Sequence, residues 1–249
     1  MSFGTTCAIV PVKVLAQAKH RLSSVLPDAV RQRLVLAMLQ DVLAAGVGAQ
    51  GIDWVAVVTA DQRVAALAQS CAASVLPEPG PELGPELGPE LGPELGPELG
   101  AAALNAAIVS GLAYASSRGA WRVLVLPADV PLTTSSELQS LVQSRGEQAG
   151  ITLAPSHDNN GTNGLLLVPP DAIAPCFGPG SYLAHLSRAM ARRVDVNVVH
   201  LEGLARDIDE PDDLLRLLGD AQARKRYAFI EPHVAAARKL HPTPQGNGQ

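Results

Sequence analysis

The sequence has little of what marks several large classes of protein. Only 3% of its 249 residues are aromatic, which is too few for a stacking platform that binds single-stranded nucleic acid. Lys and Arg number 19 against 24 Asp and Glu, so no basic excess is available to neutralise a nucleic-acid backbone. No stretch of about 18 apolar residues occurs, and the sequence predicts no membrane-spanning helix. We therefore expect neither nucleic acid nor a membrane as a partner.

Cysteines and targeting signals are also scarce. The three cysteines, Cys7, Cys71 and Cys176, are odd in number and lack ligand-like spacing, which disfavours a disulfide framework or a structural zinc site. Free thiols in a reducing compartment are the expected state. The first residues, MSFGTTCAIV, lack the basic segment and apolar run of a signal peptide. These observations predict a cytoplasmic protein.

What the chain does contain is a large apolar fraction, 47%, and one low-complexity repeat. Residues 81–100 read PELGPELGPELGPELGPELG and hold five of the 24 acidic residues, so the rest of the chain has 19 of each charge. Proline and glycine at every fourth position disfavour both helix and strand, and we expect a loop. The preceding tetrad, PEPG at 77–80, is in register and indicates that one loop tetrad was expanded. Residues 1–240 are expected to form a single domain, and residues 241–249 a disordered tail.

Apolar patterns predict alternating strands and helices. The strands are continuous apolar runs rather than alternating ones, which favours a mostly parallel sheet covered by helices on both faces. In such sheets ligands bind beyond the carboxyl ends of the strands. Strands are expected at 8–12, 54–58, 74–76, 123–126, 151–154, 164–168 and 194–201. Helices are expected at 28–46, with Asp28 as N-cap and Gly46 as terminator, at 61–70, at 104–116 with an interruption at Gly111, at 135–145, 181–192 and 211–218, and over 221–240 in two pieces broken at Pro232.

Three cationic side chains follow the first predicted strand. Lys13, Lys19 and Arg21 lie in the loop between this strand and the first helix, at the carboxyl edge of the sheet. An arginine fork and lysine point charges at that place suit a triphosphate. Neither a P-loop nor a dinucleotide-binding glycine motif is present. The alternative interpretation is a solvated basic loop.

Carboxylates follow the strands at two further places. Asp129 comes after an apolar strand and between two prolines, where it suits magnesium bridged to phosphates or, alternatively, a helix cap or turn. Alternation places Asp207 and Asp209 on one face of an extended segment, and two such carboxylates are costly to hold together without a cation. The alternative there is a solvated acidic turn.

Two glycine-containing loops complete the set. Residues 158–164 form a polar loop between strands, and residues 177–181 read FGPGS before a helix. Bare amides and a serine at a helix N-terminus form an anion site, so a second phosphate-bearing ligand would fit. An ordinary serine N-cap is the alternative.

Taken together, these segments resemble the phosphoacid guanylyltransferase family of coenzyme F-420 biosynthesis, also called 2-phospho-L-lactate guanylyltransferases. The matching stretches, from residue 9 to residue 214, are IVPVKVLAQAKHRL, LPADVPL, GTNGLLLVPP, FGPGSYLAH and GLARDIDEPDDL. The resemblance implies an α/β, Rossmann-like nucleotide-diphospho-sugar transferase fold. It also implies transfer of GMP from GTP to a three-carbon phosphoacid with magnesium as cofactor and release of pyrophosphate.

The resemblance also assigns residues. It implies that the nucleotide is bound by Pro11, Lys13, Lys19, Arg21 and Asn105, and that the three cationic side chains among them are catalytic. It implies that the acceptor is bound by Thr162, Gly178 and Ser181. It implies that the metal is bound by Asp129 and Asp207, with Asp209 as a substitute for Asp207. One departure is that the PELG repeat precedes the triplet Ala103-Leu104-Asn105, where the family usually has Gly-Leu-Asn after a short glycine loop.

Other interpretations remain open at this point. Nucleotidyl transfer to another acceptor such as a molybdopterin, or a GTP-binding protein without catalysis, would use the same fold. Phosphoenolpyruvate, 2-phospho-L-lactate and 3-phospho-D-glycerate differ by only a hydroxyl or a double bond, and no single residue chooses between them. The sequence has no pattern that specifies an oligomeric state.

Overall fold

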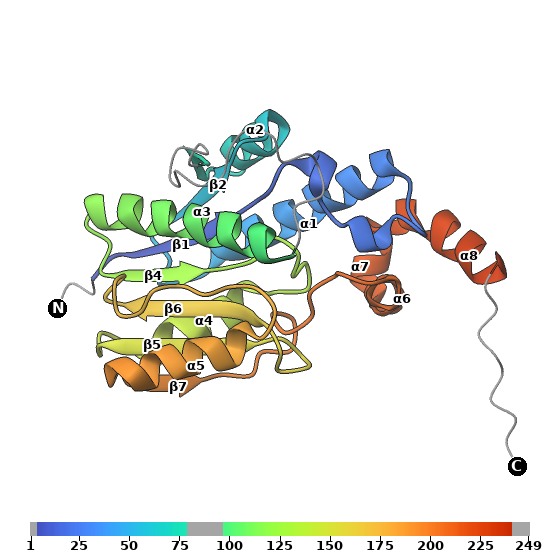
Figure 1. Cartoon of the computed structure of the whole chain (residues 1–249). Helices are drawn as coiled ribbons and strands as arrows, with labels where there is room; N and C mark the ends of the chain where they lie inside the picture. Colours follow the sequence, from blue (N-terminus) through green and yellow to red (C-terminus); the bar gives the residue numbers. More distant parts are fainter. Residues whose placement is uncertain (1–3, 79–96, 241–249) are drawn as a thin grey trace, which may run out of the picture.

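The computed structural model describes residues 4–78 and 97–240, in which seven strands form one sheet (Figure 1). The strand order is β3-β2-β1-β4-β6-β5-β7. β6 runs antiparallel to β4 and β5, and the other pairings are parallel, which confirms the predicted mostly parallel mixed sheet. The strands are β1 (Thr6–Pro11), β2 (Trp54–Thr59), β3 (Ser74–Pro77), β4 (Arg122–Val125), β5 (Gly150–Pro155), β6 (Thr162–Val168) and β7 (Val196–Val198).

Helices cover both faces of this sheet, as expected (Figure 1). They are α1 (Asp28–Gly48), α2 (Gln62–Ser70), α3 (Pro97–Ser117), α4 (Ser135–Gln143), α5 (Ser181–Arg192), α6 (Pro211–Gly219), α7 (Ala221–Arg226) and α8 (Glu231–Leu240). Side chains of β1 alternate between the two cores. Ala8 and Val10 belong to the core that also holds α1, whereas Cys7 and Ile9 belong to the core that holds α3. The sheet thus has α3 and α5 on one face and α1, α2 and α4 on the other.

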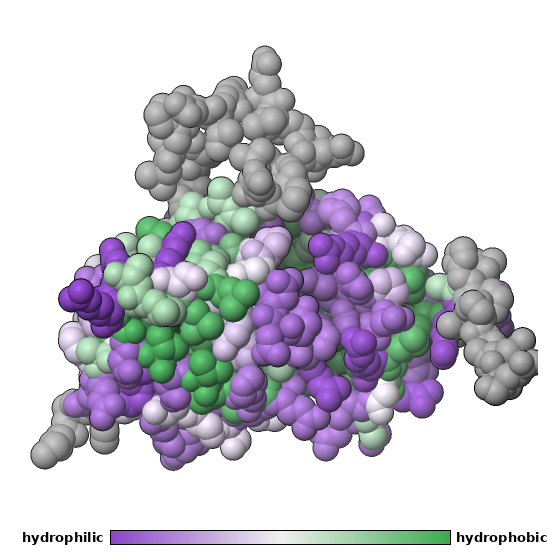
Figure 2. Space-filling model, turned by 60° about the horizontal axis from the view of Figure 1, so that its bottom comes forward, coloured by the Kyte–Doolittle hydropathy of each residue, from purple (hydrophilic) through white to green (hydrophobic). Residues whose placement is uncertain are grey.

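Helix α5 shows how one helix divides between core and surface. Ser181, His185 and Ala189 are buried, while Leu183 and Met190 are 65% and 76% exposed. Figure 2 shows one face of the molecule, on which hydrophobic side chains gather in a patch left of centre that hydrophilic side chains border. None of the helices in residues 4–78 and 97–240 has the length and apolar character that crossing a bilayer requires. The three cysteines are free, as predicted.

Two glycines expected to end or interrupt helices do neither. α1 continues past Gly46 to Gly48, and α3 continues through Gly111. A Cβ added at Gly46 would lie 3.3 Å from Val55, and one added at Gly111 would lie 2.8 Å from Ile9. These glycines therefore let the helices approach the sheet closely. Asp28 is the first residue of α1 rather than its cap, and its carboxylate pairs with Arg31 instead.

Three other boundaries differ from the sequence prediction. β7 covers only Val196–Val198. This edge strand pairs with β5 alone, and just beyond its end the N–H of Val199 still donates to the carbonyl of Leu153 at 2.9 Å. The C-terminal helical region is interrupted at Tyr227, which is buried and whose hydroxyl donates to Asp41. Pro232 is the second residue of α8, where a proline is tolerated because its missing N–H has no helical partner.

The loop predicted for the PELG repeat also ends earlier than expected. Its last tetrad, residues 97–100, forms the first turn of α3, so the expected loop does not extend to residue 100 and the helix begins before Leu104. A proline fits the first position of a helix because the N–H there lacks a helical acceptor in any case. Residues 81–96 and the predicted tail, 241–249, lie outside the described residues.

Candidate active site

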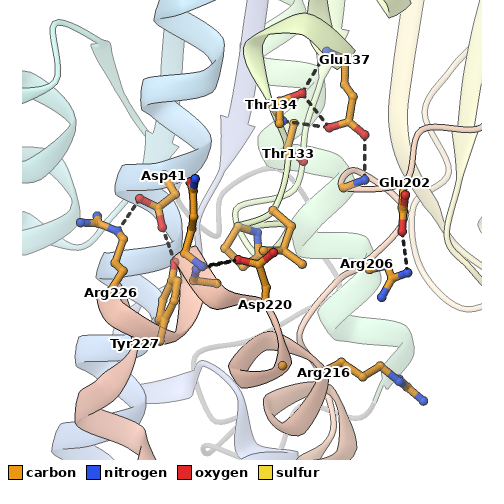
Figure 3. Close-up of a pocket in the computed structure, with 16 residues that line it drawn as sticks. Asp41, Thr133, Thr134, Glu137, Glu202, Arg206, Arg216, Asp220, Arg226 and Tyr227 are labelled. Carbon is orange, nitrogen blue, oxygen red and sulfur yellow. Dashed lines mark hydrogen bonds and ion pairs between the residues drawn. The ribbon is translucent and has the colours of Figure 1, made fainter.

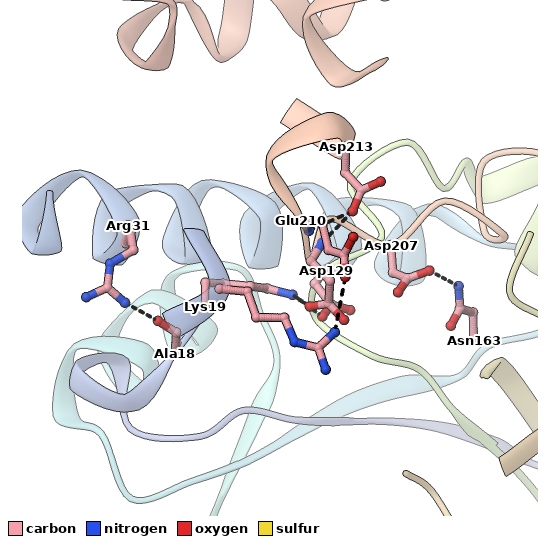
Figure 4. Close-up of polar contacts among 10 residues, drawn as sticks. Ala18, Lys19, Arg31, Asp129, Asn163, Asp207, Glu210 and Asp213 are labelled. Carbon is pink, nitrogen blue, oxygen red and sulfur yellow. Dashed lines mark hydrogen bonds and ion pairs between the residues drawn. The ribbon is translucent and has the colours of Figure 1, made fainter. Parts of the chain in front are cut away.

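The loop after β1 is fixed by apolar anchors and two 3₁₀ turns, η1 (Leu15–Gln17) and η2 (His20–Leu22). Leu15, Leu22 and Leu26 are at most 1% exposed. Arg31 of α1, itself buried, donates a hydrogen bond of 2.9 Å to the carbonyl oxygen of Ala18 (Figure 4). The loop between the carboxyl end of β1 and α1 is therefore a braced segment, and Lys19 follows directly after Ala18.

Lys19 stands at the centre of the charged cluster at this edge. Its backbone is left-handed, with φ of 55°, and its side chain is only 9% exposed. Its Nζ donates to Oδ2 of Asp129 and to Oδ1 of Asp209, both at 2.5 Å (Figure 4). The N–H of Ile208 also donates to the Asp129 carbonyl at 2.9 Å, which joins the two loops. The structure thus brings together residues 19, 129 and 209, as the rule for parallel strands predicts.

The charges in this cluster shift the pKa values of Lys19 and Asp209. Burial alone would lower the pKa of Lys19, but the neighbouring charges of Asp129 and Asp209 raise it above its usual value. Burial alone would raise the pKa of Asp209, but the contact with Lys19 outweighs burial and lowers this pKa. Lys19 and Asp209 are therefore both charged near neutral pH. One ammonium therefore neutralises only part of the two carboxylates that it joins.

The Asp207 side chain lines a different hollow from the Asp209 side chain. Its Oδ1 accepts a hydrogen bond of 3.1 Å from the side chain of Asn163, and it lines a separate hollow of about 230 Å³ with His157 and Arg206. Burial, and then the charge of Asp129, raise its pKa. Asp207 and Asp209 line different hollows, but the charges of Asp129 and Asp209 both contribute to the raised pKa of Asp207, and the shared face of the two carboxylates stays a prediction.

A cavity of about 370 Å³ opens beside Lys19. Its apolar wall comes from α1, α3 and the loop before α5, and this volume lies within the usual range for small-molecule sites. The predicted residues that line it are Pro11, Lys13, Lys19, Asp129 and Asp209. Arg21 does not line it. Its exposed side chain lies 3.6 Å from Glu210.

A larger hollow of about 890 Å³ lies elsewhere and shares no lining residue with this cavity (Figure 3). Its rim carries charges of both signs that pair with each other. Arg226 contacts Asp41 at 2.5 Å and Arg206 contacts Glu202 at 2.9 Å. None of the residues predicted to bind nucleotide, acceptor or metal lines it, so the smaller cavity is the candidate active site.

The three predicted acceptor-binding residues lie in one hydrogen-bond network, in which Thr162 and Ser181 are buried. The N–H of Thr162 donates to Oγ of Ser181 at 3.0 Å, and the N–H of Ser181 donates to the carbonyl of Gly178 at 3.1 Å. Gly178 has φ of +136°, a conformation that favours glycine. The structure therefore brings these residues together, next to the start of α5.

Asn105 belongs to the same region. Its side-chain oxygen accepts from the N–H of Phe177 at 2.8 Å, and its amide donates to the carbonyls of Phe177 and Ala101, each at 2.8 Å. Both amide hydrogens are thus used within the protein. Because Phe177 lines the cavity, Asn105 fixes part of the cavity wall, and its direct contact with a nucleotide stays a prediction.

Comparison with known proteins identifies the family. The model for "Guanylyl transferase CofC like" matches residues 6–83 and 99–239. The chain belongs to this family. It is 37% identical to a phosphoenolpyruvate guanylyltransferase of Sphaerobacter thermophilus over 87% of this chain and 94% of that one. It is 30% identical to a 2-phospho-L-lactate guanylyltransferase of Methanothermobacter thermautotrophicus over 89% of each.

Solved structures confirm the fold of this guanylyl transferase family member. A Desulfovibrio desulfuricans structure described as a nucleotide-diphospho-sugar transferase has a TM-score of 0.67 at 16% identity, covering 94% of this chain and 97% of that one. A glucosyl-3-phosphoglycerate synthase of Mycobacterium tuberculosis, solved with Mn²⁺ and uridine diphosphate, has a TM-score of 0.53 at 12% identity, covering 93% and 80%. A structural neighbour with this fold thus binds a divalent cation.

The acidic cluster of this guanylyl transferase family member fits a divalent cation. Within the described residues, no group of three or more His, Cys, Asp and Glu side chains is arranged as a metal site. Magnesium needs fewer protein ligands, because it is usually held by one or two carboxylates together with waters and substrate phosphates. Asp129 and Asp209 already converge on one positive atom, Nζ of Lys19. The donor set is therefore suitable, with Asp207 nearby.

Sequence reasoning missed His185. It is fully buried in α5, its Nδ1 lies 3.0 Å from Oγ1 of Thr162, and its Nε2 accepts from the N–H of Cys176 at 3.0 Å. Its ring also meets the ring of Phe177 edge to face, with centroids 4.9 Å apart. The available signal was spacing, because His185 follows Ser181 by four residues and so lies on the same side of the helix.

Proposed function

We propose that this protein transfers GMP from GTP to the phosphate of a three-carbon phosphoacid and releases pyrophosphate, as a step toward coenzyme F-420. The observation that carries the proposal is the cluster of Lys19, Asp129 and Asp209 beside the 370 Å³ cavity. Partly neutralised carboxylates and cationic side chains, at the carboxyl edge of a nucleotidyltransferase sheet, suit a metal-bound triphosphate. Membership of the guanylyl transferase family agrees with this chemistry.

The reaction requires little covalent chemistry from the protein. An oxygen of the acceptor phosphate attacks the α-phosphorus of GTP, a new P–O bond forms, and the bond to the β-phosphate breaks as pyrophosphate leaves. The attacking oxygen is already anionic, so no general base is needed. Catalysis then depends on positioning and on stabilising charge at the α-phosphorus.

The basic loop would hold the triphosphate. Lys13 and Lys19 line the cavity. Arg21 is exposed, and its charge contributes to the lowered pKa of Asp209, so it would add positive charge to the phosphates bound beside this cluster. Mg²⁺ would be held by Asp129 with Asp209 or Asp207. When bound, Mg²⁺ neutralises charge on the phosphates. Lys19 would then exchange part of its contact with the two carboxylates for contact with phosphate oxygens.

The acceptor would bind at Thr162, Gly178 and Ser181. Hydroxyl and backbone N–H groups at the start of a helix suit the two anionic groups of a phosphoacid. Phosphoenolpyruvate is the first acceptor to test, because the relatives of that name in this comparison reach 37% and 38% identity against 30% for the 2-phospho-L-lactate relative.

The test is pyrophosphate release from GTP and Mg²⁺ with phosphoenolpyruvate, 2-phospho-L-lactate and 3-phospho-D-glycerate supplied one at a time. Release that depends on one of them supports the proposal and identifies the acceptor. CTP and ATP in place of GTP serve as controls for the base. GTP binding without turnover on any acceptor would overturn it in favour of a non-catalytic GTP-binding protein, and turnover only with a molybdopterin would overturn the acceptor class.

A further inference from the structure

The tautomer of His185 is fixed by its neighbours. A backbone N–H can only donate, so the hydrogen bond from Cys176 requires a bare Nε2. In a neutral ring the hydrogen must then be on Nδ1. The ring is neutral, because burial and then the charge of Arg188 lower the pKa of His185 to about 4.

This tautomer determines how the Thr162 hydroxyl is used. With its hydrogen on Nδ1, His185 donates to Oγ1 of Thr162, which must accept at 3.0 Å. The Ser181 hydroxyl is also an acceptor within the protein, because its Oγ accepts a hydrogen bond from the N–H of Thr162. Within the described residues, neither hydroxyl donates to a protein acceptor. Each therefore keeps its own hydrogen available for an anionic ligand.

His185 also joins the three segments that carry the acceptor residues. It is part of α5, which begins at Ser181, it contacts Thr162 at the start of β6, and it holds the Cys176–Phe177 backbone just before Gly178. These contacts come from one buried ring. A shift of this ring would move all three acceptor positions.

We infer that His185 is a positioning residue of the phosphoacid site, which holds the Thr162 hydroxyl as a hydrogen-bond donor to the acceptor; the hydrogen bond from the N–H of Cys176 fixes the tautomer that this role requires. The inference rests on the proposed function, because it assumes that a phosphoacid binds there. It assigns His185 no contact with substrate and no proton transfer.

Two substitutions distinguish the roles of the two ring nitrogens of His185. His185→Asn keeps a donor near the position of Nδ1 and loses the acceptor for Cys176, whereas His185→Gln keeps an acceptor near Nε2 and loses the donor to Thr162. We expect His185→Gln to raise the KM for the phosphoacid by about tenfold to a hundredfold, which is the usual range for one hydrogen bond to a charged group. His185→Asn should recover most of this, and the KM for GTP should change little in both.

Matched controls make the result decisive. His200→Asn changes an exposed histidine and should behave like the wild type. Thr162→Val combined with His185→Gln should be no worse for phosphoacid binding than Thr162→Val alone, because His185→Gln acts on the acceptor through the Thr162 hydroxyl, which Thr162→Val already removes. Equal losses for GTP and phosphoacid, or a His185→Asn variant as defective as His185→Gln, would overturn the inference.

Nitrogen-15 NMR of the wild-type histidines gives a readout independent of turnover. A neutral His185 with its hydrogen on Nδ1 supports the inference even where a variant fails to fold, and a hydrogen on Nε2 overturns it. A wild type that releases no pyrophosphate with any phosphoacid overturns the proposed function instead. Calorimetric titration of phosphoenolpyruvate into wild type and His185→Gln then decides the role of His185 separately.

Discussion

The two halves of the candidate site are built in opposite ways. On the side of the 370 Å³ cavity, the ammonium of Lys19 forms ion pairs with the carboxylates of Asp129 and Asp209, and Asp209 is 46% exposed. On the acceptor side, Thr162, Ser181 and a neutral His185 form a buried network without ionised members. Partly exposed ion pairs exchange partners at low cost, whereas a buried network is costly to rearrange. We therefore expect the first half to adjust when ions and nucleotide bind, and the second to be preformed.

The largest effect is expected where a full charge is removed. Asp129→Ala should lower kcat by about a thousandfold or more, because it removes a ligand for the metal and a partner of Lys19. The fold should survive, since the Asp129 side chain is 27% exposed and Asp209 still pairs with Lys19. Pyrophosphate release measured against Mg²⁺ concentration checks this. Retained activity with the same Mg²⁺ dependence would contradict the metal assignment.

The second prediction concerns the stability of the neutral half in acid. The pKa of His185 is about 4 in the folded protein against 6.5 for an ordinary histidine, so the unfolded chain binds more protons between these values. The stabilising contribution is complete above pH 6.5 and is lost as the pH falls toward 4, by about 3 kcal/mol.

Urea unfolding of wild type and His185→Asn at several pH values measures this contribution. The wild type should lose more free energy of unfolding between pH 6.5 and 4 than the variant. Asp207 acts in the opposite direction, because its pKa is raised on folding, but it is present in both proteins and cancels in the comparison. Parallel pH curves would show that His185 is not held neutral.

A smaller and more local effect is expected for Ser181→Ala. It removes one hydroxyl that accepts from Thr162 and keeps its hydrogen for the acceptor, a loss of about 1.5–3 kcal/mol in phosphoacid binding. The KM for the phosphoacid should rise while the affinity for GTP changes little. Titrations of each substrate check this. Weaker GTP binding with an unchanged phosphoacid KM would mean that the two halves are assigned in the wrong order.

The smallest effect is expected from shortening the repeat. Deleting residues 81–96 joins Gly80 to Pro97 in register and keeps the first turn of α3, so the free energy of unfolding should change by about 1 kcal/mol or less. Deleting residues 81–100 replaces that turn and is the matched comparison. Because Gly100 lies near Lys13 and Asn105 holds Phe177, the longer deletion should weaken GTP binding more. A large fall in melting temperature for the shorter deletion would contradict the loop assignment.

Sequence reasoning brought Lys19 and Asp129 of the charged half to one edge of the sheet, but it missed His185 of the neutral half. Lys19 and Asp129 each follow an apolar parallel strand, and this rule is enough to place them at one edge of the sheet. His185 has no such marker, because its partners lie at residues 162 and 176 and meet it only in the folded chain. A lone histidine in a helix is usually an ordinary core residue.

The fold was predicted in its elements more than in its boundaries. Gly46 and Gly111 resemble helix terminators in sequence, but their role is close packing against β2 and β1, which depends on tertiary contacts. Asp207 and Asp209 lie in a segment without regular secondary structure, so their alternation in sequence does not determine which hollow each carboxylate lines.

The helical last tetrad of the repeat bears on how the gene can vary. Every copy has the same four residues, so α3 begins with Pro-Glu-Leu-Gly whichever number of copies precedes it. Replication slippage that adds or removes whole tetrads would keep the reading frame and leave the sequence of the helix start unchanged. Strains of the source organism are therefore expected to differ in repeat length while sharing one sequence from residue 97 onward, and such length variants form a natural series for measuring what the insertion does.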